Sequence, residues 1–321
     1  MSADNIKSTH RVEVVPVVLE KHPDADTLSI VRVFGYTVCV RTADWESRSI
    51  GAYIPPDSVV PDVPEFAFLG DKKRIKVRRL RGIVSMGLLV QAPEGAKVGD
   101  DVAERLNVKH YEPPTSFRTG GDIEAGPAGY HPVYDVDTWY RYKQLLRPGE
   151  EVRVTEKIHG SSGRWVFQEG RMWSASRTQW WKSGEDNLWW KALKCNPWVE
   201  EFCRANEGAT VYGEVYGRVQ DLHYGVPPSR LDVAAFDILS GQDWWPAAKL
   251  DATLSGHLVP LLFSGPYDEA KAPLLAEGSS TVPGAKHVRE GCVIRPVNER
   301  TDPEIGRVQL KIVSSGYLER A

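Results

Sequence analysis

The middle of the chain reads Val152-Arg153-Val154-Thr155-Glu156-Lys157-Ile158-His159-Gly160-Ser161-Ser162-Gly163. Its alternation predicts a β-strand in which Val152 and Val154 face a core while Thr155 and Lys157 project from the opposite side. Gly160 and Gly163 follow, and glycine lets a backbone approach a phosphate closely. A lysine in this position is more often a solvated strand end, so a nucleotide pocket must be supported by the rest of the chain.

Length and charge set the broad class of the protein. The chain has 321 residues, which exceeds the usual size of one hydrophobic core and predicts two domains. A formal net charge of -3 excludes a uniformly basic nucleic-acid coat but allows one basic face. The four cysteines, at positions 39, 195, 203 and 292, lack metal-ligand spacing and a disulfide framework. Met1 to Arg11 is polar and no apolar run reaches about 18 residues, so we expect a soluble, cytoplasmic protein.

The first third of the chain carries short runs of alternating apolar residues. These runs lie around residues 12–17, 28–33 and 36–40, and a further strand is expected over 82–90. Turn residues separate them at 22–26 and 54–58. The pattern predicts a small antiparallel barrel.

A basic segment follows within this region. Seven of the ten residues from 72 to 81 are basic: Lys72, Lys73, Arg74, Lys76, Arg78, Arg79 and Arg81. Ile75, Val77 and Leu80 are interleaved with them, so the charges are expected to share one face and to bind phosphates of a nucleic acid. The alternative is a solvated basic strand edge that prevents aggregation.

Two motifs of this region resemble the tRNA-binding OB domains appended to some aminoacyl-tRNA synthetases. They are His22-Pro-Asp24-Ala-Asp26-Thr-Leu28 and Lys76-Val-Arg78-Arg79-Leu-Arg81-Gly82-Ile-Val-Ser85-Met-Gly87-Leu. The resemblance implies a five-stranded OB β-barrel over residues 1–110 that binds nucleic acid through the basic segment. Residues 112–129 are rich in Pro, Gly and Thr, so a linker is expected at 111–130.

The remaining residues, 131–321, are predicted to form the larger domain. A helix is expected over 134–146, with a turn at 147–150 that leads into the central strand. A hairpin is expected over 164–178, and a helical stretch over 186–206 is interrupted at Pro197. Most of the tryptophans here are expected to pack in a core, although stacking on bases is the alternative.

Three further strands present charged residues in the manner of Lys157. They cover residues 210–217, 289–296 and 307–312, and they carry Glu214, Glu290 and Lys311. Glu214 lies next to Gly213 and Glu290 next to Gly291, which leaves room for a ligand. Each charge alone would be read as a surface residue. Their recurrence indicates one site, with Lys157, Glu214, Glu290 and Lys311 as candidate catalytic residues.

The order of six motifs resembles that of the covalent nucleotidyltransferases, the superfamily of ATP-dependent ligases and RNA capping enzymes. The motifs are Lys157-Ile-His159-Gly160, Ser174-Ala-Ser176-Arg177, Tyr212-Gly213-Glu214, Ala235-Phe236-Asp237-Ile238, Glu290-Gly291 and Leu310-Lys311. Within the superfamily the chain is most similar to the RNA ligases. His159 stands where capping enzymes and DNA ligases have aspartate, and the OB domain comes first, as in small nick-sealing RNA ligases of bacteria and amoebae.

The resemblance implies an α+β fold: an N-terminal OB barrel followed by a nucleotidyltransferase (ATP-grasp-like ligase) domain of antiparallel sheets with flanking helices. It implies that Lys157 takes AMP from ATP with release of pyrophosphate. The AMP then passes to an RNA 5′-phosphate, and a 3′-hydroxyl displaces it and closes the strand in RNA repair. One departure is Gln309, because many relatives have a lysine there.

The same resemblance implies roles for individual residues. Glu214 and Glu290 would hold Mg²⁺ or Mn²⁺. Arg177 and Lys311 would bind phosphate oxygens, and Phe236 would stack on adenine. His159 would either contact the nucleotide or brace the turn. The full nucleotide-binding set is Glu156, Ile158, His159, Gly160, Arg177, Phe236 and Lys311.

Two other functions stay open from the sequence. The first is a GTP-using capping-type transferase, which the domain order and His159 disfavour. The second is a nucleic-acid-binding protein that has lost activity, which the presence of all four candidate catalytic residues disfavours. The expected partner is RNA or an RNA-containing nicked duplex, with no membrane, and a monomer is favoured.

Overall fold

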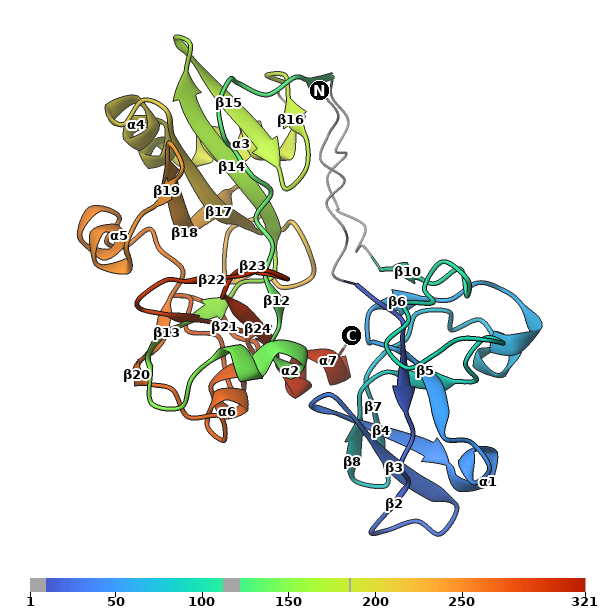
Figure 1. Ribbon diagram of the computed structural model, residues 1–321. Coiled ribbons are helices and arrows are strands. Elements are labelled where there is room, and N and C mark those ends of the chain that lie inside the picture. Colours follow the sequence, from blue (N-terminus) through green and yellow to red (C-terminus); the bar gives the residue numbers. More distant parts are fainter. Residues whose placement is uncertain (1–9, 112–121, 185, 321) are drawn as a thin grey trace. The chain divides into compact units, whose positions relative to one another are not determined.

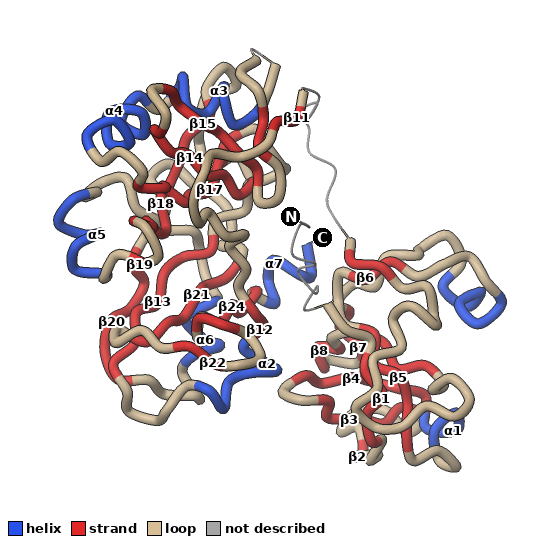
Figure 2. The backbone as a smooth tube through the Cα atoms, turned by 45° about the horizontal axis from the view of Figure 1, so that its top comes forward, coloured by secondary structure: helices blue, strands red, loops and turns tan. Residues whose placement is uncertain are grey.

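The computed structural model describes residues 10–111, 122–184 and 186–320. The chain divides into two units, one of Met1–Pro113 with Leu318–Ala321 and one of Pro114–Tyr317. Strands form most of the regular structure and helices are short, so the fold is α+β, as the sequence predicts (Figure 2). None of the helices in the described ranges is long and apolar enough to cross a membrane.

The strands of the first unit form four small sheets, two with three strands and two with two strands (Figure 1). One sheet contains β1 (Glu13–Pro16), β5 (Ile50–Ile54) and β9 (Leu88–Val90). A second contains β2 (Glu20–Lys21), β3 (Leu28–Val33) and β4 (Tyr36–Arg41). The two-stranded ladders are β6 (Ser58–Val59) with β10 (Lys109–His110), and β7 (Arg78–Leu80) with β8 (Ile83–Ser85). A closed five-stranded barrel is not recorded among these described strands and stays a prediction.

Two short helices complete the first unit, α1 (Thr42–Trp45) and the 3₁₀ helix η1 (Pro64–Leu69). The strand expected over 82–90 is divided into β8 and β9 at Gly87, which has a φ of 90°. A side chain at Gly87 would meet the Ile54 carbonyl oxygen at 2.6 Å, so this bend requires glycine.

His22 explains why the two OB-like motifs occur together. Its imidazole is fully buried, lies 3.2 Å from the Leu80 carbonyl oxygen and 3.1 Å from the Asp24 nitrogen. It therefore ties the 22–28 turn to the β7–β8 hairpin, which carries the end of the basic segment. The motif that contains His22 therefore stabilises the packing of these two segments of the first unit.

The basic segment does not present seven equivalent cations. Lys73 forms an ion pair with Asp62 at 2.7 Å, and Arg74 forms one with Asp57 at 2.7 Å. Lys76 and Arg78 are exposed on either side of the buried Val77. Arg79 pairs with Glu319 at 2.5 Å. The expected common face is therefore partly neutralised, because three of its cations hold carboxylates of their own unit.

The second unit contains two sheets, and the larger has seven strands. Their order is β11 (Ile123–Glu124), β16 (Trp180–Trp181), β15 (Arg171–Ser176), β14 (Ser161–Gln168), β17 (Ala209–Gly217), β18 (Leu231–Ser240) and β19 (Asp243–Trp244). The helices α3 (Leu188–Cys195) and α4 (Pro197–Ala205) share a core with this sheet. Their separation at Pro197 confirms the predicted interruption. The predicted hairpin is β14 with β15.

The smaller sheet has five strands in the order β12 (Asp137–Thr138), β24 (Leu310–Val313), β21 (Gly291–Pro296), β13 (Glu151–Lys157) and β20 (Leu261–Pro266). All pairs are antiparallel except β12 with β24. Val152 and Val154 of β13 are buried in its core, as predicted. The remaining elements are α5 (Ala247–Thr253), α6 (Ala272–Ala276), the strand pair β22 (Thr301–Asp302) and β23 (Gly306–Arg307), and α7 (Ser315–Arg320).

Two expectations need correction. The helix expected over 134–146 is limited to α2 (Trp139–Tyr142) and the 3₁₀ helix η2 (Lys143–Leu145), because Asp137 and Thr138 pair with β24 instead. The predicted linker is shorter than 111–130: residues 112–121 of it lie outside the described residues, but β11 pairs with β16. Gly126 lies against the Trp180 ring, where a side chain would clash at 2.3 Å. Glycine at position 126 is therefore required by close packing against Trp180.

All four cysteines are free. Cys203 and Cys292 are buried, whereas Cys39 and Cys195 are half-buried. Burial raises the pKa of the Cys203 and Cys292 thiols to about 12 each, so these two are inert packing residues.

Candidate active site

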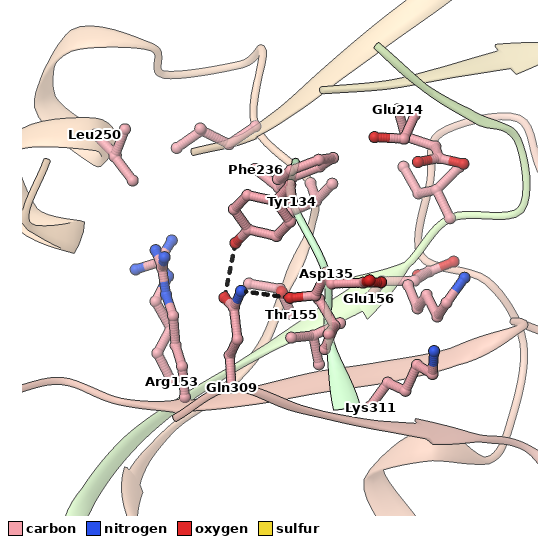
Figure 3. Close-up of a pocket in the computed structure, with 18 residues that line it drawn as sticks. Tyr134, Asp135, Arg153, Thr155, Glu156, Glu214, Phe236, Leu250, Gln309 and Lys311 are labelled. Carbon is pink, nitrogen blue, oxygen red and sulfur yellow. Dashed lines mark hydrogen bonds between the residues drawn. The ribbon is translucent and has the colours of Figure 1, made fainter. Parts of the chain in front are cut away.

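A pocket opens between the two sheets of the second unit (Figure 3). The five-stranded sheet contributes Lys157 from β13 and Lys311 from β24, and the seven-stranded sheet contributes Glu214 from β17 and Phe236 from β18. Residues 134–136, which we call the Tyr134 segment, also line it. The structure therefore brings together four of the predicted site residues that lie far apart in the sequence.

Lys157 meets Glu290 at this site. Lys157 is directly opposite Gly291 in the β13–β21 pair, so the adjacent Glu290 reaches its amine. Lys157 Nζ donates to Glu290 Oε2 at 2.8 Å, and the two side chains are 29% and 10% exposed. A β-carbon at position 291 would lie 1.9 Å from the Ile312 carbonyl oxygen. Glycine is therefore required at 291 to let β21 and β24 approach at this point.

Glu214 faces this pair from the other sheet. It is opposite Ser162 in the β14–β17 pair, and Gly160 lies where a β-carbon would be 2.1 Å from the Val215 carbonyl oxygen. The glycine after the lysine therefore lets the turn pack against β17. Burial raises the pKa of Glu214 to about 8; Lys157 opposes this shift and Glu290 adds to it. A second cation near Glu214 would favour its ionised form.

Lys311 is the second cation of the pocket. It is opposite Val293 in the β21–β24 pair and projects from the sheet face that carries Lys157, while its neighbours Leu310 and Ile312 are buried on the other face. Burial and the charge of Lys157 lower the pKa of the Lys311 amine, against the effect of Asp135 and Asp137. An anionic ligand between the two lysines would therefore be stabilised by both.

Phe236 lies among aromatic rings that form one wall of the pocket. Its ring centroid is 4.6 Å from that of Tyr134, which also packs edge-on against Trp244 at 5.5 Å. The apolar residues Leu250, Leu258 and Val259 complete this wall. Flat aromatic and aliphatic surfaces are suited to a planar base.

Glu156, Arg177 and His159 are predicted to bind the nucleotide, but in the structure each of them contacts other residues of the protein. Glu156 belongs to the pocket lining, but its carboxylate accepts hydrogen bonds from Ser280 Oγ and from the Thr281 backbone at 2.5 and 2.7 Å. It therefore holds the loop after α6. Arg177 does not line the pocket; its guanidinium lies 3.3 Å from Asp135, which does.

His159 also lies outside the pocket lining. Its Nε2 is 3.0 Å from Asp221, its backbone N–H donates to Tyr224 Oη at 2.6 Å, and Tyr317 Oη lies 3.2 Å from Nδ1. Burial lowers the pKa of this imidazole. Of the two roles left open by the sequence, these contacts favour bracing of the turn that follows Lys157.

Sequence reasoning missed a buried polar cluster beside the pocket. Asp237 is fully buried and accepts hydrogen bonds from Tyr134 Oη at 3.0 Å, Arg295 at 3.1 Å and Arg307 at 2.8 Å. Its position next to Phe236 in the fourth motif was the available signal. Asp237 therefore anchors Tyr134 from the segment and Arg295 from β21 beside the aromatic wall of the pocket.

Gln309 holds the Tyr134 segment from below. The Tyr134 hydroxyl lies 2.7 Å from Gln309 Oε1, and Gln309 Nε2 donates to the Asp135 carbonyl oxygen at 3.0 Å (Figure 3). Both ends of the amide are thus used within the protein. The residue that replaces a family lysine has a bracing contact here, which a lysine amine could not reproduce because it accepts no hydrogen bond.

We expect replacement of Gln309 by alanine to lower the free energy of unfolding by about 1–3 kcal/mol, because the Asp135 carbonyl would lose its buried partner. It should also raise the KM for ATP, since the Tyr134 segment lines the pocket. Chemical denaturation and steady-state adenylylation measure these effects, with exposed Gln242→Ala as the control. A Gln309→Lys variant with a lower KM would contradict the bracing role and indicate a missing phosphate contact instead.

The described residues of the pocket do not form a complete set of metal ligands. No cluster of three or more His, Cys, Asp or Glu side chains suited to a metal ion occurs among the described residues. Glu214 and Glu290 supply two carboxylates from opposite sheets. Such a pair fits a hard ion that keeps several waters or takes further oxygens from a bound phosphate.

Comparisons with known proteins agree with this arrangement. The RNA ligase family model matches residues 150–313, and an OB-fold domain model matches residues 8–92. A lysine-to-alanine mutant of a Naegleria gruberi RNA ligase, solved with ATP and Mn, has a TM-score of 0.81 at 20% identity, over 97% of this chain and 98% of that chain. The same organism's RNA ligase with PPi has a TM-score of 0.81 at 21% identity, over 97% and 98%.

No curated protein sequence matches the chain. The likeness to the solved structures shows the fold, and the first unit has an OB-fold domain. The RNA ligase model spans Lys157, Glu214, Glu290 and Lys311 and covers just over half of the residues. The chain therefore belongs to the RNA ligase family.

Proposed function

We propose that this protein is an ATP-dependent RNA ligase that joins a 3′-hydroxyl RNA end to a 5′-phosphate end through a covalent lysyl-AMP. The observation that carries the proposal is the Lys157 amine, which meets Glu290 beside a pocket lined by a second lysine, a carboxylate and an aromatic wall. A nucleophile, a phosphate-attracting cation and a base-sized apolar surface are parts that the reaction needs.

The chemistry begins with a proton transfer. A protonated lysine cannot attack phosphorus, so Lys157 must lose a proton, and the Glu290 carboxylate at 2.8 Å is placed to accept it. The neutral Nζ attacks the α-phosphorus of ATP, a P–N bond forms, and the bond to the β-phosphate oxygen breaks with release of pyrophosphate. The 5′-phosphate of RNA then displaces Lys157 from the AMP, and a 3′-hydroxyl displaces AMP to form the phosphodiester.

The residues assigned from the sequence keep these roles as proposals. Glu214 and Glu290 would hold Mg²⁺ or Mn²⁺, which would neutralise phosphate charge. Lys311 would bind phosphate directly, whereas Arg177 would have to exchange Asp135 for it. Phe236 would stack on adenine. Ile158 lines the pocket, and Glu156, His159 and Gly160 would shape the wall around the nucleotide.

RNA would be bound by the OB-fold domain, which we place at 1–110, and adenylyl transfer would take place in a nucleotidyltransferase domain, which we place at 131–321. The exposed cations of the basic segment support this assignment, as does the OB-fold match. Sealing of nicks in duplex, as part of RNA repair, is the form of the activity that the two-domain order favours. The five-stranded barrel belongs to the same proposal.

Labelling with nucleotide tests the proposed activity. Full-length protein is incubated with α-labelled ATP or α-labelled GTP and a divalent metal, and then with a nicked RNA duplex that carries a 5′-phosphate. We expect a protein adduct from ATP that is stable to base and labile to acid, followed by sealing. An adduct from GTP alone would favour the capping-type alternative, and no adduct from either would indicate an inactive binding protein.

Glu290 gives a sharper test of the proton transfer. We expect Glu290→Gln to reduce the rate of adduct formation by about 10²–10⁴-fold, because the amide cannot take the proton of Lys157. The variant keeps the shape of the side chain, so thermal unfolding should change little. The exposed Glu207→Gln is the control. A rate for Glu290→Gln within threefold of the control at saturating metal would exclude Glu290 as the proton acceptor.

A further inference from the structure

The β3–β4 hairpin of the first unit has an unusual residue at its tip. Val33 and Tyr36 pair across the hairpin, which leaves Phe34 and Gly35 as a two-residue turn. Phe34 adopts a φ of 53° and is 43% exposed. Two-residue turns normally place glycine, Asn or Asp at positive φ, and a bulky side chain there is a conformational outlier. Such outliers concentrate at binding sites.

The Phe34 ring is supported from beneath. It contacts Tyr53 edge-on, with ring centroids 6.4 Å apart and planes at 71°. Tyr36 packs on the same Tyr53 ring at 5.6 Å. Tyr53 itself is buried. The hairpin thus holds an exposed aromatic ring against a buried one. Because the exposed ring is already ordered, binding of a ligand to it costs less conformational entropy.

The β3–β4 hairpin that carries this tip lies beside the basic β7–β8 hairpin, and β4 contacts β8 (Figure 1). The Met86 N–H donates to the Thr37 carbonyl oxygen at 2.8 Å, and Tyr53 Oη donates to the Met86 carbonyl oxygen at 3.2 Å. Met86 directly follows Ser85, which is opposite Arg78 in the β7–β8 pair. The residues that fix the aromatic tip therefore also fix the strand end that carries Arg78.

Cations near this point are available for a ligand. Lys76 and Arg78 are exposed, and neither of them forms an ion pair with any residue that the structure describes. They contrast with Lys73 and Arg74, which hold carboxylates. An exposed aromatic ring beside uncompensated cations is the combination that binds single-stranded nucleic acid, since a base stacks while its phosphates are neutralised.

We propose that Phe34 is a stacking platform for an unpaired RNA base whose neighbouring phosphates contact Lys76 and Arg78. The inference rests on the proposed function only in taking RNA as the substrate. Bases within a duplex are stacked on each other and cannot cover the ring. The protein should therefore bind RNA that has a single-stranded segment more tightly than a fully paired duplex.

Binding of the full-length protein to labelled oligonucleotides tests the platform. Fluorescence anisotropy compares a single-stranded RNA of about 12 nucleotides with a fully paired RNA duplex of the same length. We expect Phe34→Ala to weaken single-strand binding by about 5- to 100-fold and duplex binding by less than twofold. Phe34→Trp should retain single-strand affinity. Val18→Ala, an exposed apolar change in the same unit, is the control.

Salt dependence separates stacking from charge. Phe34→Ala should weaken binding by the same factor at every salt concentration, because it removes no cation. Lys76→Ala should instead reduce the slope of log K against log salt by about 0.7, the value for one phosphate contact on a single strand. Thermal unfolding checks each variant, and if Phe34→Ala does not fold, Phe34→Leu is compared with Phe34→Trp.

Three results would overturn the platform: single-strand affinity of Phe34→Ala equal to that of Val18→Ala, equal losses on single strand and duplex, or displacement of RNA by poly-glutamate as effectively as by unlabelled RNA. The last would indicate an acidic protein partner. The nucleotide-labelling experiment is independent of these. RNA binding without an adduct would remove the ligase proposal alone, and an adduct with unchanged Phe34→Ala binding would remove the platform alone.

Discussion

Replacement of Lys157 by alanine is expected to reduce labelling of the protein by α-labelled ATP below detection, and with it sealing from a 5′-phosphate RNA end. The amine is the only group of this chain to which we assign the P–N bond, so its loss removes the step and does not merely slow it. The structural cost is expected to be about 1–3 kcal/mol, because Lys157 is partly exposed but its loss leaves the nearly buried Glu290 carboxylate without this cation. Mapping of the labelled peptide in the native protein identifies the modified lysine.

Two further variants make this test specific. Lys157→Arg keeps the positive charge beside Glu290 but offers no nucleophilic amine, so it should be equally unlabelled. Lys182→Ala, which removes an exposed lysine of the same unit, should label normally. RNA that already carries AMP on its 5′-phosphate should be sealed by Lys157→Ala, since only the first step is missing. Label that persists in Lys157→Ala, or that maps to another lysine, would refute the assignment.

Replacement of Asp237 by alanine is expected to have the largest effect on stability, a loss of about 3–5 kcal/mol in the free energy of unfolding. The Asp237 carboxylate is fully buried and neutralises Arg295 and Arg307, which are themselves nearly buried. Its removal leaves two cations in a low-dielectric region with Glu299 as their remaining carboxylate partner among the described residues. The free energy of unfolding of Asp237→Asn should lie between those of the native protein and Asp237→Ala, because the amide keeps one acceptor and loses the charge.

Tryptophan fluorescence during denaturant unfolding measures this loss. Of the eleven tryptophans only Trp45 lies in the first unit, so the signal reports the second unit that contains Asp237. Asp232→Ala, on the same strand, is the matched control: its ion pair with Arg230 is partly exposed, at 24% for Asp232 and 58% for Arg230, and should contribute less than about 1 kcal/mol. A loss for Asp237→Ala no larger than that of Asp232→Ala would show that the cluster does not stabilise the unit.

Alternation along single strands was enough to predict several features of the site. It gave the strand that ends at Lys157, the burial of Val152 and Val154, and the projection of Glu214 and Lys311 from the faces of their strands opposite to the buried apolar residues. It also gave the hairpin of β14 and β15 and the break at Pro197. These features depend on neighbours within a few residues, where the two-residue period of a strand and the geometry of proline act directly.

The other features of the site depend on contacts between residues that lie far apart in the chain. Tyr134 and Gln309 meet across 175 positions, and Asp237 neutralises two arginines that are 58 and 70 positions away. Sequence period assigns a side chain to a face of its own strand, but not to a neighbour on another sheet. For the same reason, residues 122–130 were read as linker, although β11 completes a sheet edge, and Lys73 and Arg74 were read as free for RNA, although each holds a carboxylate. A buried or paired charge is tolerated only where the fold supplies its counterpart, and that counterpart is set by tertiary contact.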